Sequence, residues 1–436
     1  QRGGLAVAEV PVDWYDAPGS KVRPARTTLA FLRDLVRIRL LHRRTDMTAS
    51  SGRRLAVVTA MPPSRTTLNE YGFHLTRHLA AHPQVEEVIA FTEDGPAEAP
   101  SGVRVAPCWR FDSVISPLRI LRQARRDRPD VLVFNLHFTS MGGRRIPAAL
   151  GLCTPALLRL FGHRTLVILH NLVDTVDLES AGFGSSRVVN GLMRGIGAGL
   201  TRVVLLANKV STTMPTYVDI LEDRYGATNV YLGPHGVFDE PDFAGSAPVD
   251  GRPRIVTFGK FGTYKRVEGL VAAYRQLLDS GYGDLELVVA GSDSPNSAGY
   301  LDEVRESTAD LSGVTFTGYV AEEDVPALFK SASVVAFPYT STTGSSGPLH
   351  QAGTFGRTAV VPEVGDFLDL IHEEGFAGVP FDPRRPDSLA EALAAVLDSD
   401  ELRDRLGRTN HAAATGLPLA DIVEWHVGHI DELIAA

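Results

Sequence analysis

The chain has 436 residues, of which 44% are hydrophobic and 22% are charged, and its formal net charge is −9. This composition argues against disorder, and the length predicts two domains of roughly 180 residues each with extra segments at the ends. The acidic balance argues against nonspecific nucleic-acid binding, which depends on cations that neutralise phosphates. Two cysteines are too few for a disulfide framework and fit a reducing cytoplasm.

The first 46 residues differ in character from the rest of the chain. A strand is predicted over residues 6–14 and an amphipathic basic helix over residues 26–44. Residues 1–54 hold 11 Lys and Arg against 5 Asp and Glu. Such a basic segment favours a solvated helix, and a helix that binds an anionic membrane surface is the second interpretation.

Strands alternate with helices from residue 54 to residue 238, which we predict to be the first domain. A helix is predicted over residues 69–81, and residues 146–158, which are too short to span a bilayer, favour a buried or surface-seated helix over a membrane-touching one. Apolar runs of strand length occur at residues 55–60, 87–91, 131–134, 165–169 and 203–206. Short uninterrupted apolar strands separated by helices predict a parallel sheet that is covered on both faces.

The alternation restarts after residues 239–253, whose Pro, Gly, Asp and Ala are typical of a linker. Residues 416–436 are predicted to form a terminal helix. The second series of strands and helices predicts a second domain over residues 250–415. Its strands are predicted at residues 254–258, 285–290, 314–316, 334–337 and 358–361. The predicted fold class is α/β, with two doubly wound Rossmann-like parallel-sheet domains facing a cleft, and ligands in such folds bind at the carboxyl ends of the strands.

A loop with two glycines and two lysines follows the first strand of the second domain and precedes a helix. Gly259 and Gly262 let the backbone approach a ligand closely, while Lys260 and Lys265 bring two positive charges to the same loop. The N-terminus of the following helix adds its dipole. Together these features predict a site for a diphosphate, although solvated lysines on an ordinary loop are the alternative.

A second glycine-rich loop follows the strand predicted at residues 334–337. Gly344 and Gly347 are expected to expose backbone amides, and Ser345 and Ser346 provide small hydroxyl donors. Pro348 stands where a helix would begin. Three or four amides aimed at one point form the nest that phosphate oxygens prefer, and an ordinary capped helix start is the alternative.

With these two loops, residues 254 to about 410 resemble the nucleotide-binding domain of the family-4 retaining glycosyltransferases of GT-B fold. In that family an Arg and a Lys grip the diphosphate of the donor, and Lys260 and Lys265 stand at their positions. The resemblance also implies that the backbone near Tyr319 and Val320 faces the base of a nucleoside diphosphate sugar.

The sequence departs from that family at two positions. The family has two glutamates eight residues apart, and Thr343 and Gln351 occupy their places. The second glutamate contacts the ribose in the family, where Gln351 would bond more weakly. The first contacts the hexose hydroxyls, and Thr343 lacks its charge. Phosphate binding is therefore better supported than the identity of the sugar.

The first domain carries candidate cleft residues at the ends of its strands. His170 matches the family's histidine at the reacting centre, and His137 ends the neighbouring strand. Gly72 and Arg65 follow the first strand, where the family has a loop that touches donor phosphates. For His235, between the two domains, a structural hydrogen bond is preferred to a functional role.

Residues 8–22 and the basic helix after them resemble the C-terminal tail of a family-2 polyprenyl-phosphate sugar transferase. This resemblance implies that the chain is the back portion of a fused two-enzyme polypeptide, and a basic arm packed on the body is the alternative. With the cysteine usage and the basic segment, we expect a cytoplasmic chain, with a peripheral contact to the inner face of the membrane left open.

We therefore expect a hexosyltransferase that moves a hexose from a nucleoside diphosphate sugar to an acceptor hydroxyl with retention, in polysaccharide or glycolipid assembly. The expected acceptor is a carbohydrate or a polyprenyl-linked intermediate, with no nucleic-acid partner. No cofactor is expected, and the lack of an Asp-x-Asp motif near the donor loops predicts leaving-group support without a metal ion. The alternatives are a catalytically silent nucleotide-sugar-binding protein and a sugar phosphorylase.

Overall fold

The computed structural model describes the chain from residue 52 to residue 436 with short gaps. The basic tail, Arg65 and Thr343 lie outside the described residues, and so do the strand and helix predicted within that tail. The described residues are 52–64, 66, 68–172, 187–238, 241–243, 245–248, 251–294, 297–341 and 344–436.

Seven parallel strands form the first sheet, in the order β3-β2-β1-β4-β5-β6-β7. The strands are β1 (Arg53–Val58), β2 (Val85–Glu93), β3 (Val103–Trp109), β4 (Val131–Leu136), β5 (Thr165–Leu169), β6 (Lys209–Thr212) and β7 (Val230–Leu232). Four of the apolar runs singled out in the sequence lie in β1, β2, β4 and β5. The fifth prediction, a strand at residues 203–206, is wrong, because a run of four apolar residues is equally compatible with the end of a helix.

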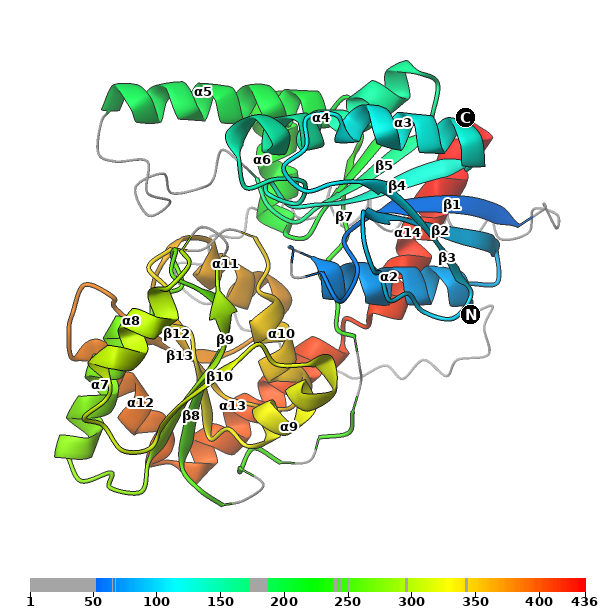
Figure 1. Ribbon diagram of the computed structural model, residues 1–436. Coiled ribbons are helices and arrows are strands. Elements are labelled where there is room, and N and C mark those ends of the chain that lie inside the picture. The colour runs from blue at the N-terminus through cyan, green and yellow to red at the C-terminus, as the bar shows by residue number, and fades with distance from the viewer. Residues whose placement is uncertain are drawn as a thin grey trace, which may run out of the picture. The chain divides into compact units, whose positions relative to one another are not determined.

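Helices cover both faces of this sheet (Figure 1). Side chains alternate between the faces along each strand, so Leu55 and Val57 of β1 pack in one buried cluster while Ala56 and Val58 pack in another. One cluster includes α2 and α14, and the other includes α3 to α6. The helices are α2 (Asn69–Ala81), α3 (Ser116–Asp127), α4 (Arg145–Leu160), α5 (Arg187–Val204), α6 (Pro215–Tyr225) and α14 (Leu419–Ala435).

Six parallel strands form the second sheet, in the order β10-β9-β8-β11-β12-β13. The strands are β8 (Arg254–Phe261), β9 (Glu286–Asp293), β10 (Val314–Gly318), β11 (Val334–Ala336), β12 (Ala359–Pro362) and β13 (Gly378–Phe381). The helices around it are α7 (Glu268–Asp279), α8 (Tyr300–Ser307), α9 (Val325–Lys330), α10 (Gly347–Thr354), α11 (Gly365–Glu374), α12 (Ser388–Leu397) and α13 (Asp400–Thr415). The predicted fold class, two doubly wound parallel-sheet domains, is confirmed.

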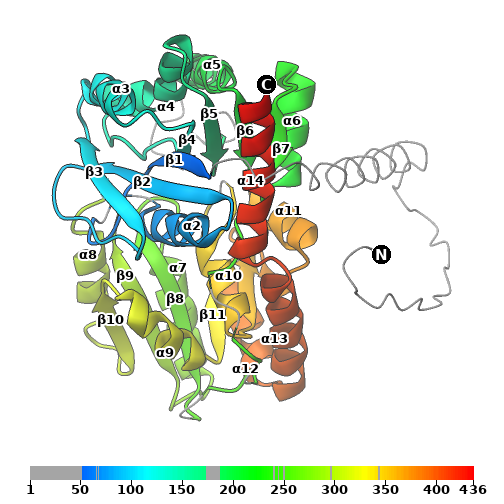
Figure 2. The ribbon, with the colours of Figure 1, turned by 90° about the vertical axis from the view of Figure 1, so that its right-hand side faces the viewer.

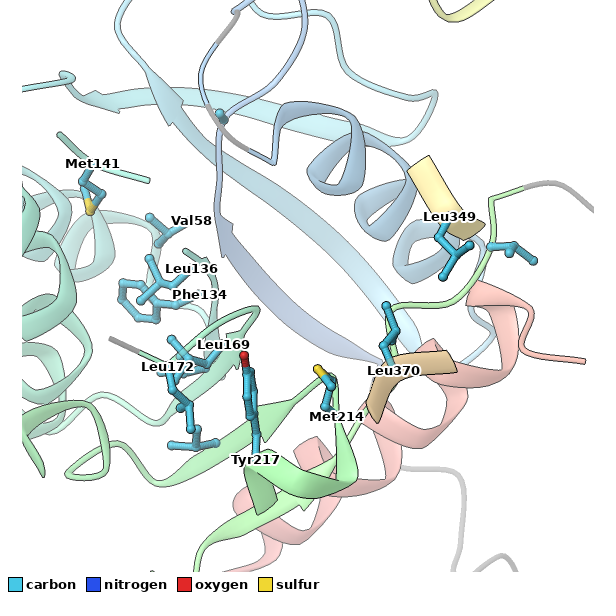
Figure 3. Packing of buried hydrophobic residues seen from close by; sticks show 14 of the residues in the cluster. Val58, Phe134, Leu136, Met141, Leu169, Leu172, Met214, Tyr217, Leu349 and Leu370 are labelled. Carbon is cyan, nitrogen blue, oxygen red and sulfur yellow. The ribbon is translucent and has the colours of Figure 1, made fainter. Parts of the chain in front are cut away.

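One buried cluster links the two domains. It runs from Val58 and Phe134 of the first sheet to Leu349 and Leu370 of the second domain, with Tyr217 of α6 also a member (Figure 3). A second cluster packs α7 and α12 against the other face of the second sheet. The apolar side chains that join the domains therefore lie close to the ends of the strands, where the candidate site residues are found.

The last helix, α14, packs on the first domain although it follows the second in sequence (Figure 2). Its Trp425 indole donates a hydrogen bond of 2.9 Å to the Leu232 carbonyl, and its Asp431 accepts one of 2.6 Å from Arg53. A backbone bridge between Val237 and Pro418 marks the point where the chain returns. None of the helices in the described ranges combines the length and apolar character that a membrane span requires.

Candidate functional site

The loop after β8 is shaped by two glycines with positive φ. Gly259 has φ 145° and Gly262 has φ 104°. A side chain at Gly259 would meet the Lys265 ammonium at 3.3 Å, and one at Gly262 would lie 2.5 Å from Ser297 Cβ. Gly259 therefore leaves room for the Lys265 side chain to fold back against the loop, and Gly262 lets the loop pack closely on Ser297.

The structure brings Lys260 and Lys265 together. Lys265 is buried, and burial together with the charge of Lys260 lowers its pKa to about 8. Its ammonium lies 4.7 Å from the centroid of the Tyr339 ring. Burial also lowers the pKa of Lys260, while Glu70 acts in the opposite direction. The described residues provide no carboxylate partner for Lys265, so a negatively charged ligand would stabilise this ammonium strongly.

The second loop begins α10, as Pro348 predicts. Its amides are arranged differently from the expectation, because Gly344, with φ 75°, donates its amide hydrogen to the Tyr217 hydroxyl at 2.5 Å. The amides of Ser345, Ser346 and Gly347 have no acceptor among the described residues. These three amides are therefore the ones left to the predicted nest, and Gly344 instead secures the loop to the first domain.

Side chains around this loop include buried polar atoms that lack protein partners. Neither the Ser346 hydroxyl nor the Gln351 amide oxygen has a hydrogen bond to a described residue. The Ser345 hydroxyl lies 2.9 Å from Nε2 of His350, which is also 2.9 Å from the buried Glu374 carboxylate. His350 and Glu374 therefore hold the Ser345 side chain in place. The Ser346 hydroxyl and the Gln351 oxygen remain without protein partners and could bind a ligand.

Tyr319 and Val320 directly follow β10, at the carboxyl end of the sheet. The Tyr319 side chain is 44% exposed, which is unusual for a large aromatic residue in this chain. Val320 is half-buried against the main core. Their position at the strand ends agrees with a role in contacting a planar base.

At the end of β5, the His170 side chain is buried and held by Asn135. The two lie 2.7 Å apart, and the Asn135 amide nitrogen donates to the Thr59 hydroxyl at 3.0 Å. The Asn135 oxygen must therefore be the acceptor, so His170 carries its proton on Nε2. Burial lowers the pKa of His170 well below its usual value, which keeps the imidazole neutral with Nδ1 as an acceptor.

His137 is held in a similar way at the end of β4. The Asn171 amide nitrogen lies 3.0 Å from His137 Nε2, and the Asn171 oxygen accepts from the Phe138 amide at 3.2 Å. His137 Nδ1 accepts from the Thr139 amide at 3.3 Å and lies 3.0 Å from the Thr139 hydroxyl, so the ring is held between Asn171 and Thr139. Burial and then the charges of Lys260 and Lys265 lower its pKa to about 4, so the electrostatic effect of the lysine loop reaches His137.

Gly72 does not occupy the position expected of a phosphate-binding glycine. Its amide donates to the Leu68 carbonyl at 2.9 Å in the first turn of α2. A side chain here would collide with Thr59 at the end of β1, 2.1 Å away. The glycine is therefore required by the packing of helix on strand. His235 is buried and stacks on His350, and its Nδ1 donates to the Gly236 carbonyl at 2.9 Å, as the predicted structural hydrogen bond requires.

Sequence reasoning missed Glu70, although it lies in a segment that was singled out. Burial and then the charge of Glu322 raise its pKa, while Lys260 and His74 lower it. His74 in turn pairs with Glu322. A charged residue in the first turn of a helix usually indicates only capping, so no sequence signal distinguishes Glu70. Across the described ranges, His, Cys, Asp and Glu side chains form no group of three suited to a metal ion.

Comparisons with known proteins match a large part of the second domain in sequence and both domains in fold. Residues 252–399 match the family described as "Glycosyl transferases group 1". The chain is 30% identical over 177 residues to a phosphatidyl-myo-inositol mannosyltransferase of Mycolicibacterium smegmatis, covering 39% of this chain and 43% of that protein. It is 29% identical over 173 residues to an alpha-D-kanosaminyltransferase of Streptomyces kanamyceticus, covering 39% and 42%. The chain thus spans less than half the length of these curated relatives.

Similar solved structures cover both domains. A sucrose-phosphate synthase from Thermosynechococcus elongatus has a TM-score of 0.69 at 18% identity, covering 87% of this chain and 99% of that one. Anabaena HepE in complex with UDP and glucose has a TM-score of 0.62 at 14% identity, covering 87% and 99%. Together with the two parallel sheets, these likenesses show that the fold is GT-B.

Proposed function

We propose that this chain is a retaining hexosyltransferase that uses a nucleoside diphosphate sugar as its donor. The observation that carries the proposal is Lys265, a buried ammonium without a carboxylate partner among the described residues, beside Lys260. Breaking the bond between the sugar C1 and the diphosphate oxygen leaves negative charge on the diphosphate. The two lysines and the amides of Ser345, Ser346 and Gly347 would stabilise that charge without a metal ion.

The acceptor reacts on the same face of the sugar that the diphosphate leaves. The acceptor oxygen forms the new bond to C1, and its proton passes to the departing phosphate oxygen, so atoms and charges balance without a covalent enzyme intermediate. His170 contributes a neutral hydrogen-bond acceptor at Nδ1, which orients a hydroxyl of the donor sugar or of the acceptor. Gln351 accepts a hydrogen bond from the ribose through its unpartnered oxygen.

The acceptor class is a carbohydrate or a polyprenyl-linked intermediate of polysaccharide or glycolipid assembly at the cytoplasmic face of a membrane. Support comes from the basic tail, which resembles the end of a family-2 sugar transferase. It also comes from the similar mannosyltransferase, whose name gives phosphatidyl-myo-inositol as its acceptor. A family-4 assignment is supported by the order of the donor motifs.

The decisive measurement is nucleotide release from UDP- and GDP-sugars, with and without lipid extracts and oligosaccharides as acceptors. We expect acceptor-dependent release that persists in EDTA, and NMR of the product should show the anomeric configuration of the donor. An inverted product would contradict retention, and loss of release in EDTA would contradict metal independence.

A catalytically silent nucleotide-sugar binder is the second candidate, favoured by Gln351 in place of the glutamate that the family carries. Binding of a nucleotide sugar without release under any acceptor would support it and overturn the transferase. A third reading, a sugar phosphorylase, requires sugar 1-phosphate to form only when inorganic phosphate is added.

A further inference from the structure

The outer side of α3, α4 and α5 carries nearly all the large apolar side chains that the described residues expose. We define the α3–α5 surface by the exposed side chains of residues 110–128, 144–164 and 194–206. Eight of the nine exposed large hydrophobic residues belong to it, and the ninth is Tyr319 of the second domain. The eight are Val114, Ile115, Leu118, Ile146, Leu160, Phe161, Ile196 and Leu206, with exposed fractions from 48% to 80%.

The same surface is strongly basic, although the chain as a whole has a net charge of −9. Its exposed cations are Arg110, Arg122, Arg125, Arg126, Arg128, Arg144, Arg145, Arg159, Arg164, Arg194 and Arg202. The only acidic residues in these ranges, Asp112 and Asp127, are half-buried. Asp112 accepts from the Arg144 amide at 2.8 Å, and Asp127 pairs with Arg104 at 3.1 Å. Arg110 pairs with Asp94, which lies outside these ranges, at 3.5 Å. Eleven exposed arginines against two half-buried aspartates leave the surface with a large excess of positive charge.

The helices that carry these apolar and basic side chains pack side by side. Helix α3 packs beside α4, and α4 beside α5, and both views show the three helices together along one side of the first sheet (Figures 1 and 2). The Arg125 guanidinium lies 4.9 Å from the centroid of the Phe161 ring. Arg159 donates to the Leu206 carbonyl at 2.7 Å. These contacts join the three helices at one end of the layer.

We propose that the α3–α5 surface binds an anionic lipid bilayer. Arginines attract the phosphates of acidic headgroups, while Leu, Ile and Phe side chains enter the boundary between headgroups and acyl chains. Nucleic acid would account for the arginines but leaves the exposed aliphatic residues without a favourable environment. The two features coincide on one surface, and an anionic bilayer is the partner whose chemistry matches both.

This surface lies on the same domain as His137 and His170. Val114, Ile115 and Leu118 lie at or just before the start of α3, and Ile146 lies in the first turn of α4, so all four follow the carboxyl ends of β3 and β4. That edge of the sheet also carries His137. If the proposed transfer reaction holds, a lipid-linked acceptor could approach His137 from the bilayer without leaving it. Bilayer binding itself does not depend on the reaction.

The test is co-sedimentation of the full chain with vesicles of phosphatidylcholine mixed with phosphatidylglycerol, against phosphatidylcholine alone. Wild type is expected to bind the anionic vesicles and to be released by salt. Each arginine near an anionic surface is worth roughly fivefold in partitioning, so Arg122→Glu with Arg126→Glu should weaken binding by at least about 25-fold. Leu160→Ser with Phe161→Ser should weaken it by about tenfold or more, because two buried apolar side chains are lost.

Arg384→Glu with Arg408→Glu is the matched control, since both arginines are exposed on the second domain and paired with aspartates. We expect this control to bind as wild type does. Wild-type binding in both α3–α5 variants would overturn the proposal and assign any vesicle binding to another segment. Equal binding to both vesicle types, or tighter binding to single-stranded RNA that the same variants abolish, would also overturn it.

Donor binding, measured in the absence of vesicles, separates this proposal from the proposed function. Each variant should retain the wild-type affinity for the nucleotide sugar and the wild-type thermal unfolding temperature, because the substituted side chains are exposed. Loss of vesicle binding together with loss of either property would indicate misfolding and would overturn the assignment to these residues.

Discussion

The two domains share one strand pattern but present opposite kinds of chemistry at their strand ends. In the first, histidines are neutral and held by asparagines, as His170 is by Asn135. In the second, Lys265 is a buried cation for which the described residues provide no carboxylate. The histidines at the strand ends of the first domain are thus neutral and held by hydrogen bonds, whereas the strand ends of the second domain carry a buried cation that a bound anion would stabilise. The same fold can therefore position one substrate with dipoles and hold the other with charge.

The largest effect is expected from a substitution at the strand ends of the second domain. Lys265→Met removes the ammonium while keeping most of the side-chain volume, and we expect affinity for the nucleotide sugar to fall about 100-fold, since hydrogen bonds to charged groups contribute about 1.5–3 kcal/mol. The ligand-free protein should unfold at the same or a higher temperature, because an uncompensated buried charge is removed. Calorimetric titration and thermal unfolding measure both.

Lys330→Met is the control for that substitution, since Lys330 lies over the Phe355 ring of the same domain. It should leave affinity for the nucleotide sugar unchanged. A Lys265→Met protein that binds the donor within threefold of wild type would show that the buried ammonium has another purpose.

The strand ends of the first domain are tested by His170→Ala. Because we propose that the other domain binds the donor's diphosphate, the dissociation constant of the donor should change little. We expect kcat to fall about 30-fold, less than the roughly 10²–10⁴-fold typical of a general acid–base group, since His170 only orients a hydroxyl. Steady-state kinetics and titration separate the two. His163→Ala, in the loop before β5, is the control, and an unchanged kcat in His170→Ala would contradict the assignment.

The pH dependence of donor affinity should distinguish the contribution of Lys265 in the second domain from that of His170 in the first. Lys265 has a pKa of about 8 in the free protein, and a bound diphosphate favours the protonated form, so binding above pH 8 requires uptake of a proton. Affinity for a nucleoside diphosphate sugar should be flat from pH 7 to pH 7.5 and then fall by up to about tenfold per unit above pH 8. His170, whose pKa is lowered well below its usual value, should contribute nothing in this range.

The smallest expected effect concerns the hydrogen bond between Tyr217 of the first domain and Gly344 of the second. Tyr217→Phe removes the acceptor of the Gly344 amide and should reduce the free energy of unfolding by about 1–2 kcal/mol, the cost of an unpaired buried donor. Donor affinity should weaken only about threefold. Urea unfolding measures the first value, and Tyr282→Phe, which removes an exposed hydrogen bond to Asp398, should cost less.

Local patterns in the sequence predicted the parts of the molecule that depend on neighbouring residues. Short apolar strands, the two glycines of the loop at residues 259–265 and Pro348 at the start of α10 each act within a few positions. The run at residues 203–206 failed for the same reason, because four apolar residues do not distinguish a helix end from a strand.

Contacts across long stretches of chain could not be predicted in this way. The Tyr217 hydroxyl accepts from the Gly344 amide across 127 positions, and the Asn171 side chain contacts His137 across 34 positions. Each is a single polar side chain with no motif of its own. The sequence therefore predicted that Gly344 would offer its amide to a ligand, whereas tertiary structure supplies it with a protein partner.

The return of α14 to the first domain has a consequence for how the protein is made. Residues 419–433 complete the buried cluster around Leu55 and Val57, yet they are synthesised only after the whole second domain. On the ribosome, the first sheet must therefore wait with one face uncovered while the second domain folds independently. A chaperone that shields exposed strands has its longest opportunity to bind during that interval, and a truncation before residue 419 would leave the first domain permanently in that state.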